Sequence, residues 1–245
     1  MKKTLAEWEK ILHKEGFSSK YYDYLDSELI SVDWYNGDEH IVTECHHTPE
    51  YNKYLSNLGN GAEFETDWNQ CIVDGVIIYT SEFGYPRGEI RDDNWKGMIH
   101  ISDYNNEYVN FNEFTLNNFH KALWMSRNPI QAKIEICKNF ISECEILLKE
   151  KGSILKKMGF KQSACTLLEV GKYINTITAP SIEFKHPDIY NIELVFFYNI
   201  FTNKLFARRI APSNELNIIV YQDNVNDLSD KEFINILNNF LKCKN

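Results

Sequence analysis

The chain has 245 residues, 43% of them hydrophobic and 25% charged, which is the balance of a soluble globular protein with one large domain or two small ones. No run approaches the roughly 18 apolar residues that a membrane helix requires, and the segment 1–10 lacks the apolar centre of a secretory signal. Six cysteines without C-x-x-C spacing indicate neither a disulfide framework nor a standard zinc motif. We therefore expect a cytoplasmic protein with reduced thiols, no cofactor and no metal.

Sequence patterns typical of helix N-termini occur near both ends of the chain. Thr4 and Glu7 match a capping box and are followed by an apolar stripe at helical spacing. Ser229 and Glu232 repeat the capping box before a second apolar stripe. The sequence therefore predicts amphipathic helices at both ends, and we expect the C-terminal one to pack on strands formed by residues 192–222.

The segment Thr43 to Tyr51, TECHHTPEY, gathers a cysteine, two histidines and two carboxylates. The preceding Asn36-Gly37 dipeptide suits a tight hairpin turn, so the return strand reaches the two histidines and a helix follows. Alternation along a strand points Cys45 and His46 to opposite faces, with at most two or three potential metal ligands on each. A thiolate nucleophile at Cys45 is the other functional hypothesis, because a helix N-terminus favours negative charge. We interpret the segment as a structural strand-to-helix junction with Cys45 packed.

Short β-branched runs bounded by turn residues predict strands in the middle of the chain, beginning near Cys71 and Gly97. Helical spacing follows over residues 115–125, and a longer helix is predicted to begin at Pro129 and end near Gly152. We expect this longer helix to bury one apolar face. That face comprises Ile130, Ile134, Cys137, Phe140, Ile141, Cys144 and Leu148.

The arrangement of strand groups between helices favours an α+β fold over a doubly wound α/β sheet. We expect antiparallel strand groups packed with helices in one compact domain over residues 1–245. This domain can divide into an acidic, aromatic-rich half over 1–127 and a second half over 128–245, made of a helix, a strand meander and the C-terminal helix.

Charge is spread unevenly along the chain. Residues 1–125 hold 22 acidic and 10 basic side chains, a net charge of −12, whereas residues 126–245 come to +3. The first part also holds all five tryptophans. Aromatic residues anchor interfaces, and opposite charge accelerates encounter. The leading hypothesis is a protein-binding module: an acidic inhibitor or immunity-type protein that neutralises a basic effector, such as a toxin or a nucleic-acid enzyme, without binding nucleic acid or membrane itself.

The candidate contact residues of this hypothesis are acids and tryptophans of the first half. They are Asp33, Trp34, Asp38, Glu39, Glu63, Glu65, Asp67, Trp68, Asp92, Asp93 and Trp95. The alternative interpretation places the rings in the core and the acids on an ordinary solvated surface. No nucleotide-binding glycine loop, nucleophile elbow or zinc-protease motif occurs in the sequence, so none of these common motifs supports an enzymatic function.

A second constellation lies in the C-terminal half. Glu183-Phe184-Lys185 forms an E-x-K on an expected strand, and Glu169 lies 14 residues upstream. Over about 20 residues this segment resembles the PD-(D/E)xK nuclease family, although it lacks the aspartate expected before E-x-K. In such enzymes carboxylates hold Mg²⁺ and the lysine activates water or stabilises phosphate charge. The resemblance implies an alternative function, a Mg²⁺-dependent nuclease with Glu169, Glu183 and Lys185 as its site.

Overall fold

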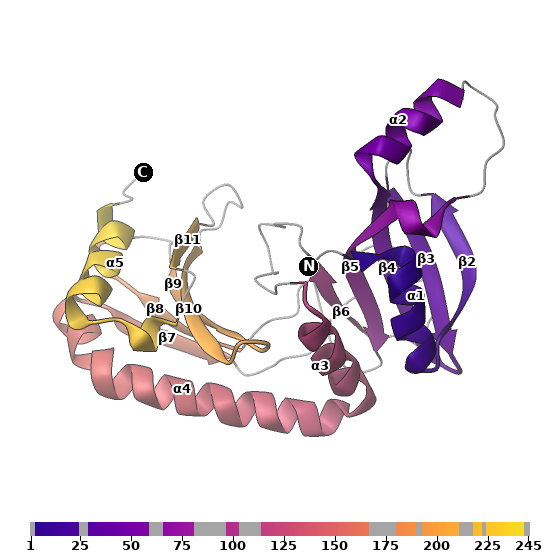
Figure 1. Cartoon of the computed structure of the whole chain (residues 1–245). Coiled ribbons are helices and arrows are strands. Elements are labelled where there is room, and N and C mark those ends of the chain that lie inside the picture. The colour runs from indigo at the N-terminus through magenta and orange to yellow at the C-terminus, as the bar shows by residue number, and fades with distance from the viewer. Residues whose placement is uncertain are drawn as a thin grey trace. The chain divides into compact units, whose positions relative to one another are not determined.

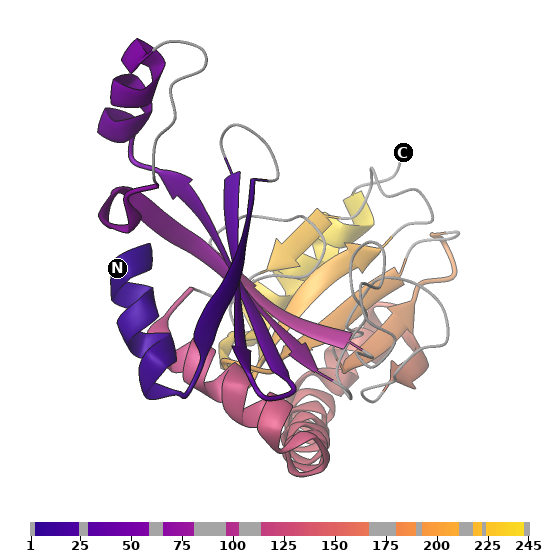
Figure 2. The same ribbon diagram turned by 90° about the vertical axis from the view of Figure 1, so that its right-hand side faces the viewer.

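The structure is a computed structural model in which two antiparallel sheets pack with helices, and this confirms the predicted α+β fold (Figures 1 and 2). It describes residues 3–24, 29–58, 66–80, 97–102, 114–166, 180–189, 193–210, 218–221 and 224–242. No helix within these ranges combines the length and the apolar character needed to span a bilayer. The chain divides into two compact units: unit 1 is Met1–Pro129 with Ile174–Thr176, and unit 2 is Ile130–Tyr173 with Ile177–Asn245.

Unit 1 is built on a sheet with the strand order β1-β5-β4-β3-β2, in which β6 also pairs with β5. Each of these pairings is antiparallel. The elements in chain order are β1 (Lys3–Thr4), α1 (Leu5–Lys14), β2 (Ser18–Tyr24), β3 (Leu29–Asn36), β4 (Glu39–His47), α2 (Pro49–Leu58), η1 (Trp68–Gln70), β5 (Cys71–Thr80), β6 (Gly97–Ser102) and α3 (Leu116–Arg127).

Local signals in the sequence correctly placed the first helix and the β3–β4 hairpin. The Glu7 backbone N–H donates to the Thr4 hydroxyl at 3.3 Å, and the Thr4 backbone N–H donates to the Glu7 carboxylate at 2.9 Å, which confirms the capping box. Strands β3 and β4 pair with Asn36 opposite Glu39, and the turn between them contains Gly37 at φ +59. Glycine suits this position because it has no Cβ to clash at positive φ.

The core of unit 1 lies between the sheet and helices α1 and α3. Trp8 of α1 is buried, and its ring centre lies 5.0 Å from that of Phe119 on α3 in an edge-on contact. Trp34 of β3 is fully buried, and its indole N–H donates to the Thr43 hydroxyl of β4 at 3.0 Å. This face of the sheet is therefore the apolar one, and neighbouring side chains along each strand point to the opposite face.

Unit 2 is an antiparallel meander with the strand order β11-β10-β9-β8-β7, accompanied by a helix before it and a helix after it. The predicted strands of residues 192–222 are β9, β10 and β11. The elements are α4 (Pro129–Lys157), β7 (Lys161–Thr166), β8 (Ser181–Lys185), β9 (Glu193–Asn199), β10 (Lys204–Ile210), β11 (Ile218–Tyr221), η3 (Val225–Asp227) and α5 (Asp230–Lys242).

The C-terminal helix α5 packs on the meander, as predicted. The Glu232 backbone N–H donates to the Ser229 hydroxyl at 3.3 Å, which closes the expected capping box. Phe233 is fully buried, and its ring centre lies 6.1 Å from that of Phe196 on β9. The hydrophobic face of α5 therefore forms part of the unit 2 core.

Two expectations about α4 are wrong. The helix does not end near Gly152 but continues to Lys157, because its last turn places Leu155 in the core and the chain reverses at Gly159, where φ is +88. The buried face also differs in part from the predicted one, because Phe140 and Cys144 are buried as expected but the rest of the predicted face is not. It consists of Ala132, Ile136, Phe140, Cys144, Leu147, Lys151 and Leu155.

Four residues of the predicted face of α4 are exposed to solvent. Ile130 is 72% exposed, Ile134 56%, Ile141 46% and Leu148 40%. The helix therefore carries two apolar stripes. The stripe that contains Phe140 packs on the sheet, and the Phe140 ring centre lies 5.9 Å from that of Tyr198 on β9.

Candidate functional site

The segment Thr43 to Tyr51 joins β4 to α2, as the sequence predicts. Cys45 and His47 are buried, whereas His46 on the opposite face is partly exposed. A hydrogen bond with Cys71, together with burial, raises the pKa of the Cys45 thiol, which disfavours the thiolate a nucleophile requires. Within the part of the chain that the structure describes, His, Cys, Asp and Glu side chains form no group of three that could hold a metal ion, and the cysteines are free.

The face of the unit 1 sheet opposite the core carries a buried histidine–carboxylate pair. His40 Nε2 lies 2.5 Å from Asp33 Oδ1, and both residues are almost fully buried. The imidazole stacks on Tyr35 of β3 at 4.4 Å and on Tyr79 of β5 at 4.5 Å between ring centres. Asp33, a candidate contact residue, is therefore engaged inside the protein.

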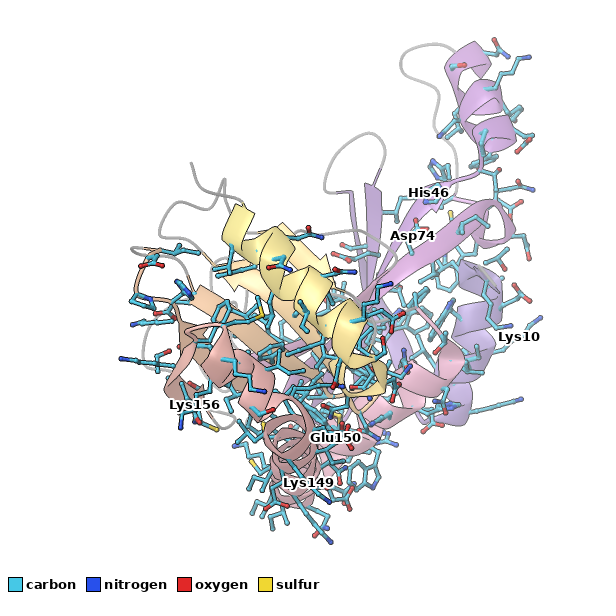
Figure 3. All side chains as sticks on the ribbon, turned by 90° about the vertical axis from the view of Figure 1, so that its left-hand side faces the viewer. Lys10, His46, Asp74, Lys149, Glu150 and Lys156 are labelled. Carbon is cyan, nitrogen blue, oxygen red and sulfur yellow. The ribbon has the colours of Figure 1, made fainter. Side chains whose placement is uncertain are left out.

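A second such pair lies on the same face, where β4 approaches α2 (Figure 3). His46 Nδ1 is hydrogen-bonded to the buried carboxylate of Asp74 on β5, at a point where the register between the two strands shifts. The His46 side chain remains 37% exposed. The buried carboxylate therefore fixes the orientation of an imidazole that keeps contact with solvent.

Sequence reasoning missed Asp74. Its signal was present, because it is the one charged residue in the otherwise apolar run CIVDGVIIYT. A buried carboxylate needs a partner to compensate its desolvation, so an acid at such a position predicts a hydrogen-bonded neighbour on an adjacent strand.

Aromatic and acidic side chains meet on α2 and the turn before β5. Tyr51 and Tyr54 stack with ring centres 5.8 Å apart, and Tyr54 is 54% exposed. The Asp67 backbone N–H donates to the Tyr51 hydroxyl at 3.4 Å, while the Glu50 and Asp67 side chains are exposed. We call Glu50, Tyr51, Tyr54 and Asp67 the α2 surface.

The α2 surface is tied to the rest of unit 1 at the start of the helix. The Thr48 backbone N–H donates to the Gln70 carbonyl at 2.7 Å, and the Thr48 hydroxyl donates to the Gln70 side-chain oxygen at 2.9 Å. The same hydroxyl accepts the Tyr51 backbone N–H at 3.3 Å, as expected of an N-cap. These bonds fix the first turn of α2, and with it Tyr51, relative to β5.

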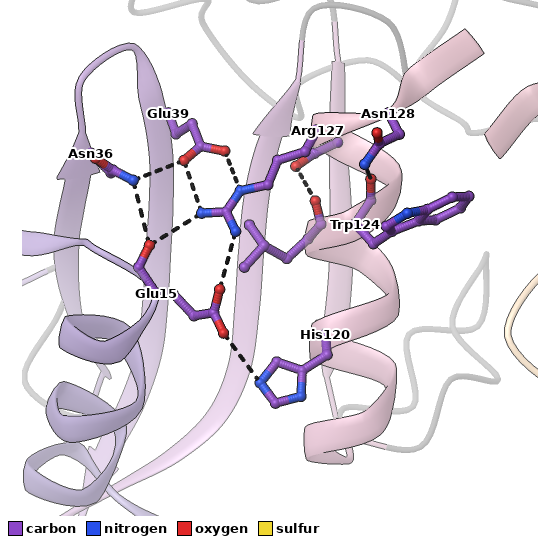
Figure 4. Close-up of polar contacts among 9 residues, drawn as sticks. Glu15, Asn36, Glu39, His120, Trp124, Arg127 and Asn128 are labelled. Atoms are coloured by element: carbon purple, nitrogen blue, oxygen red, sulfur yellow. Dashed lines mark hydrogen bonds and ion pairs between the residues drawn. The ribbon is translucent and has the colours of Figure 1, made fainter. Parts of the chain in front are cut away.

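Arg127 at the end of α3 gathers acids of unit 1 (Figure 4). Its guanidinium bonds the Glu39 carboxylate at 2.6 and 3.0 Å and the Glu15 carboxylate at 3.1 Å. The hydrogen bond with Glu39 is the main cause of the raised pKa of Arg127. Glu39, another candidate contact residue, therefore joins the β3–β4 hairpin to α3.

The remaining candidate contacts differ in accessibility. Trp34 belongs to the core, and Trp68 is half-buried with its ring centre 5.7 Å from that of Trp34. Asp38 is exposed in the hairpin turn, and Asp67 is exposed in the α2 surface. The candidates Glu63, Glu65, Asp92, Asp93 and Trp95 lie outside the described residues.

The nuclease hypothesis rests on β8, where Glu183 and Lys185 share a face. Lys185 is paired with Glu193 on β9, with Nζ 2.7 Å from the carboxylate. Burial, and then a hydrogen bond with Glu193, raise the pKa of Glu183. Glu193 was not among the predicted site residues, and the third predicted residue, Glu169, lies outside the described residues.

Comparison with known proteins found no matching family model, no matching curated protein and no matching solved structure.

Proposed function

We propose that unit 1 binds a basic protein partner through the α2 surface, and that the protein acts as an inhibitor or immunity-type partner of a basic effector. The observation that supports this is the exposed ring of Tyr54, stacked on Tyr51 and accompanied by the carboxylates of Glu50 and Asp67. A half-exposed aromatic ring offers apolar area that a partner can bury at little cost in side-chain entropy.

Each part of the α2 surface has a separate physical role. Tyr51 is held by a hydrogen bond from the Asp67 backbone and by an edge-on contact with His47, whose ring centre lies 5.0 Å away. The Tyr51 ring is therefore fixed in position where Tyr54 stacks on it. Burial of Tyr54 lengthens the lifetime of the complex, whereas exposed carboxylates act mainly on the rate of encounter with a positively charged surface.

The charge of the chain suits a basic effector. Residues 1–125 carry −12, and a protein that acts on nucleic acid exposes basic side chains to bind phosphates. A tightly bound acidic protein that covers those side chains excludes the nucleic acid. Inhibition by this route requires no catalytic group and no cofactor in the inhibitor.

The test is capture of a partner from a lysate of the native host, followed by mass spectrometry. Wild-type protein is compared with Tyr54→Ala and with the double variant Glu50→Lys, Asp67→Lys. The control Glu150→Lys, Asp188→Lys makes the same charge change at two exposed positions of unit 2. We expect a basic protein that is retained by the wild type and the control but lost by both α2-surface variants.

Kinetics with the captured protein then separate the two roles. Tyr54→Ala should mainly raise the dissociation rate, and the double charge reversal should mainly lower the association rate and its salt dependence. Equal binding by all variants refutes the α2 surface as the contact. Mg²⁺-dependent cleavage of DNA or RNA that disappears with Glu183→Ala would replace the inhibitor proposal by the nuclease alternative.

A further inference from the structure

Helix α4 carries an exposed apolar stripe that unit 2 does not bury. We define the α4 seam as Ile134, Ile141 and Leu148, which are 56%, 46% and 40% exposed. Their spacing of seven places them on one line along the helix, and this is the repeat with which two helices pack against each other. Large apolar side chains in such a row favour a helical partner.

The seam is symmetric about its middle residue. If a second α4 lies antiparallel with Ile141 beside Ile141, then Ile134 of each helix lies beside Leu148 of the other. The isologous contact of a two-fold dimer requires this kind of self-complementary surface.

The charges along one edge of the seam repeat the same symmetry. Glu135, Lys138, Glu145 and Lys149 are all exposed and alternate in sign along the helix. In an antiparallel pair, Lys138 of one helix approaches Glu145 of the other, and Glu135 approaches Lys149. In a parallel pair this edge would instead face the opposite edge of the partner helix, so these complementary contacts would not form. The edge charges therefore select the antiparallel arrangement.

We infer that the α4 seam binds the α4 seam of a second copy of this chain, forming an antiparallel dimer. This inference is independent of the proposed function, because it concerns α4 and not the α2 surface. Residues 134–148 span only about 20 Å of helix, so the interface is small and the dimer dissociates readily on dilution.

Sedimentation of the full chain over about a hundredfold range of concentration tests the dimer. We expect the wild type to shift from monomer to dimer and Ile141→Lys to stay monomeric. The control is Ile146→Lys, which makes the same change at a residue that is 37% exposed, about 140° away around the helix. The control should dimerise like the wild type, and thermal unfolding checks that all three proteins are folded.

Charge exchange tests the arrangement. Lys138→Glu should weaken dimerisation at least about tenfold, because it places a carboxylate at position 138 of one helix beside Glu145 of the other. The double variant Lys138→Glu, Glu145→Lys should restore the dissociation constant to within about threefold. A photoreactive residue at position 134 should crosslink, in the dimer, to the tryptic peptide 139–149 that contains Leu148.

Three results overturn the inference. A wild-type chain that is monomeric at every concentration shows that the seam accepts a different protein or none. A dimer that survives Ile141→Lys uses another surface. A crosslink from position 134 to the peptide 134–138 of the other copy indicates parallel helices.

Discussion

Phe240 offers the sharpest test of how unit 2 is held together. It is 2% exposed on α5, and its ring centre lies 5.6 Å from that of Phe160. Phe240→Ala loses a transfer free energy of about 2 to 3 kcal/mol. A residual cavity on the order of 60 to 80 Å³, at about 24 cal/mol per Å³, adds about 1.5 to 2 kcal/mol. We therefore expect a loss of about 4 kcal/mol in the free energy of unfolding, a large part of a typical domain's stability.

Urea unfolding measures this loss. Far-UV circular dichroism follows the helices, and tryptophan fluorescence follows unit 1, which holds all five tryptophans. The control is Asn239→Ala, which changes an exposed residue next to Phe240 on α5 and should alter the unfolding free energy by less than about 0.5 kcal/mol. A loss below about 1 kcal/mol for Phe240→Ala, with native circular dichroism, would refute the packing of α5 as the source of stability.

Three further predictions concern single contacts. Ser229→Ala should cost about 1 kcal/mol in urea unfolding because it removes the α5 cap, and no loss would show that the cap is dispensable. Burial lowers the pKa of His47, so the unfolded chain binds its proton first as the pH falls below about 6.5. The free energy of unfolding should therefore decrease from pH 7 toward lower pH. The thermal unfolding temperature of His47→Gln should depend less on pH than that of the wild type, and identical pH profiles for the two proteins would contradict this. Arg127→Gln should lower the unfolding free energy by about 1 to 2 kcal/mol, a value reduced for solvent screening because the Arg127 side chain is 33% exposed. Arg127→Lys should recover only part of this loss, because a lysine cannot bond Glu39 and Glu15 with the forked geometry of a guanidinium. Full recovery with lysine would show that the forked geometry contributes nothing.

The sequence by itself determined the features that depend on neighbouring residues. The capping boxes at Thr4 and Ser229 require only a hydroxyl and a carboxylate three residues apart, and the turn at Gly37 requires only a residue that tolerates positive φ. The apolar stripes of the first and last helices were equally readable, because each helix has a single apolar face. The α+β fold follows from the order of these local elements.

Only the tertiary structure decided which residues meet across elements. Helix α4 has two apolar stripes, and its pattern alone could not show that Phe140 faces the sheet while Ile141 faces solvent. The pairing of His46 with Asp74 depends on a register shift, and that of Lys185 with Glu193 depends on which residues of β8 and β9 are opposite each other. Registers and packing faces are set by contacts between residues distant in sequence, and their energies are therefore not expressed in any local pattern.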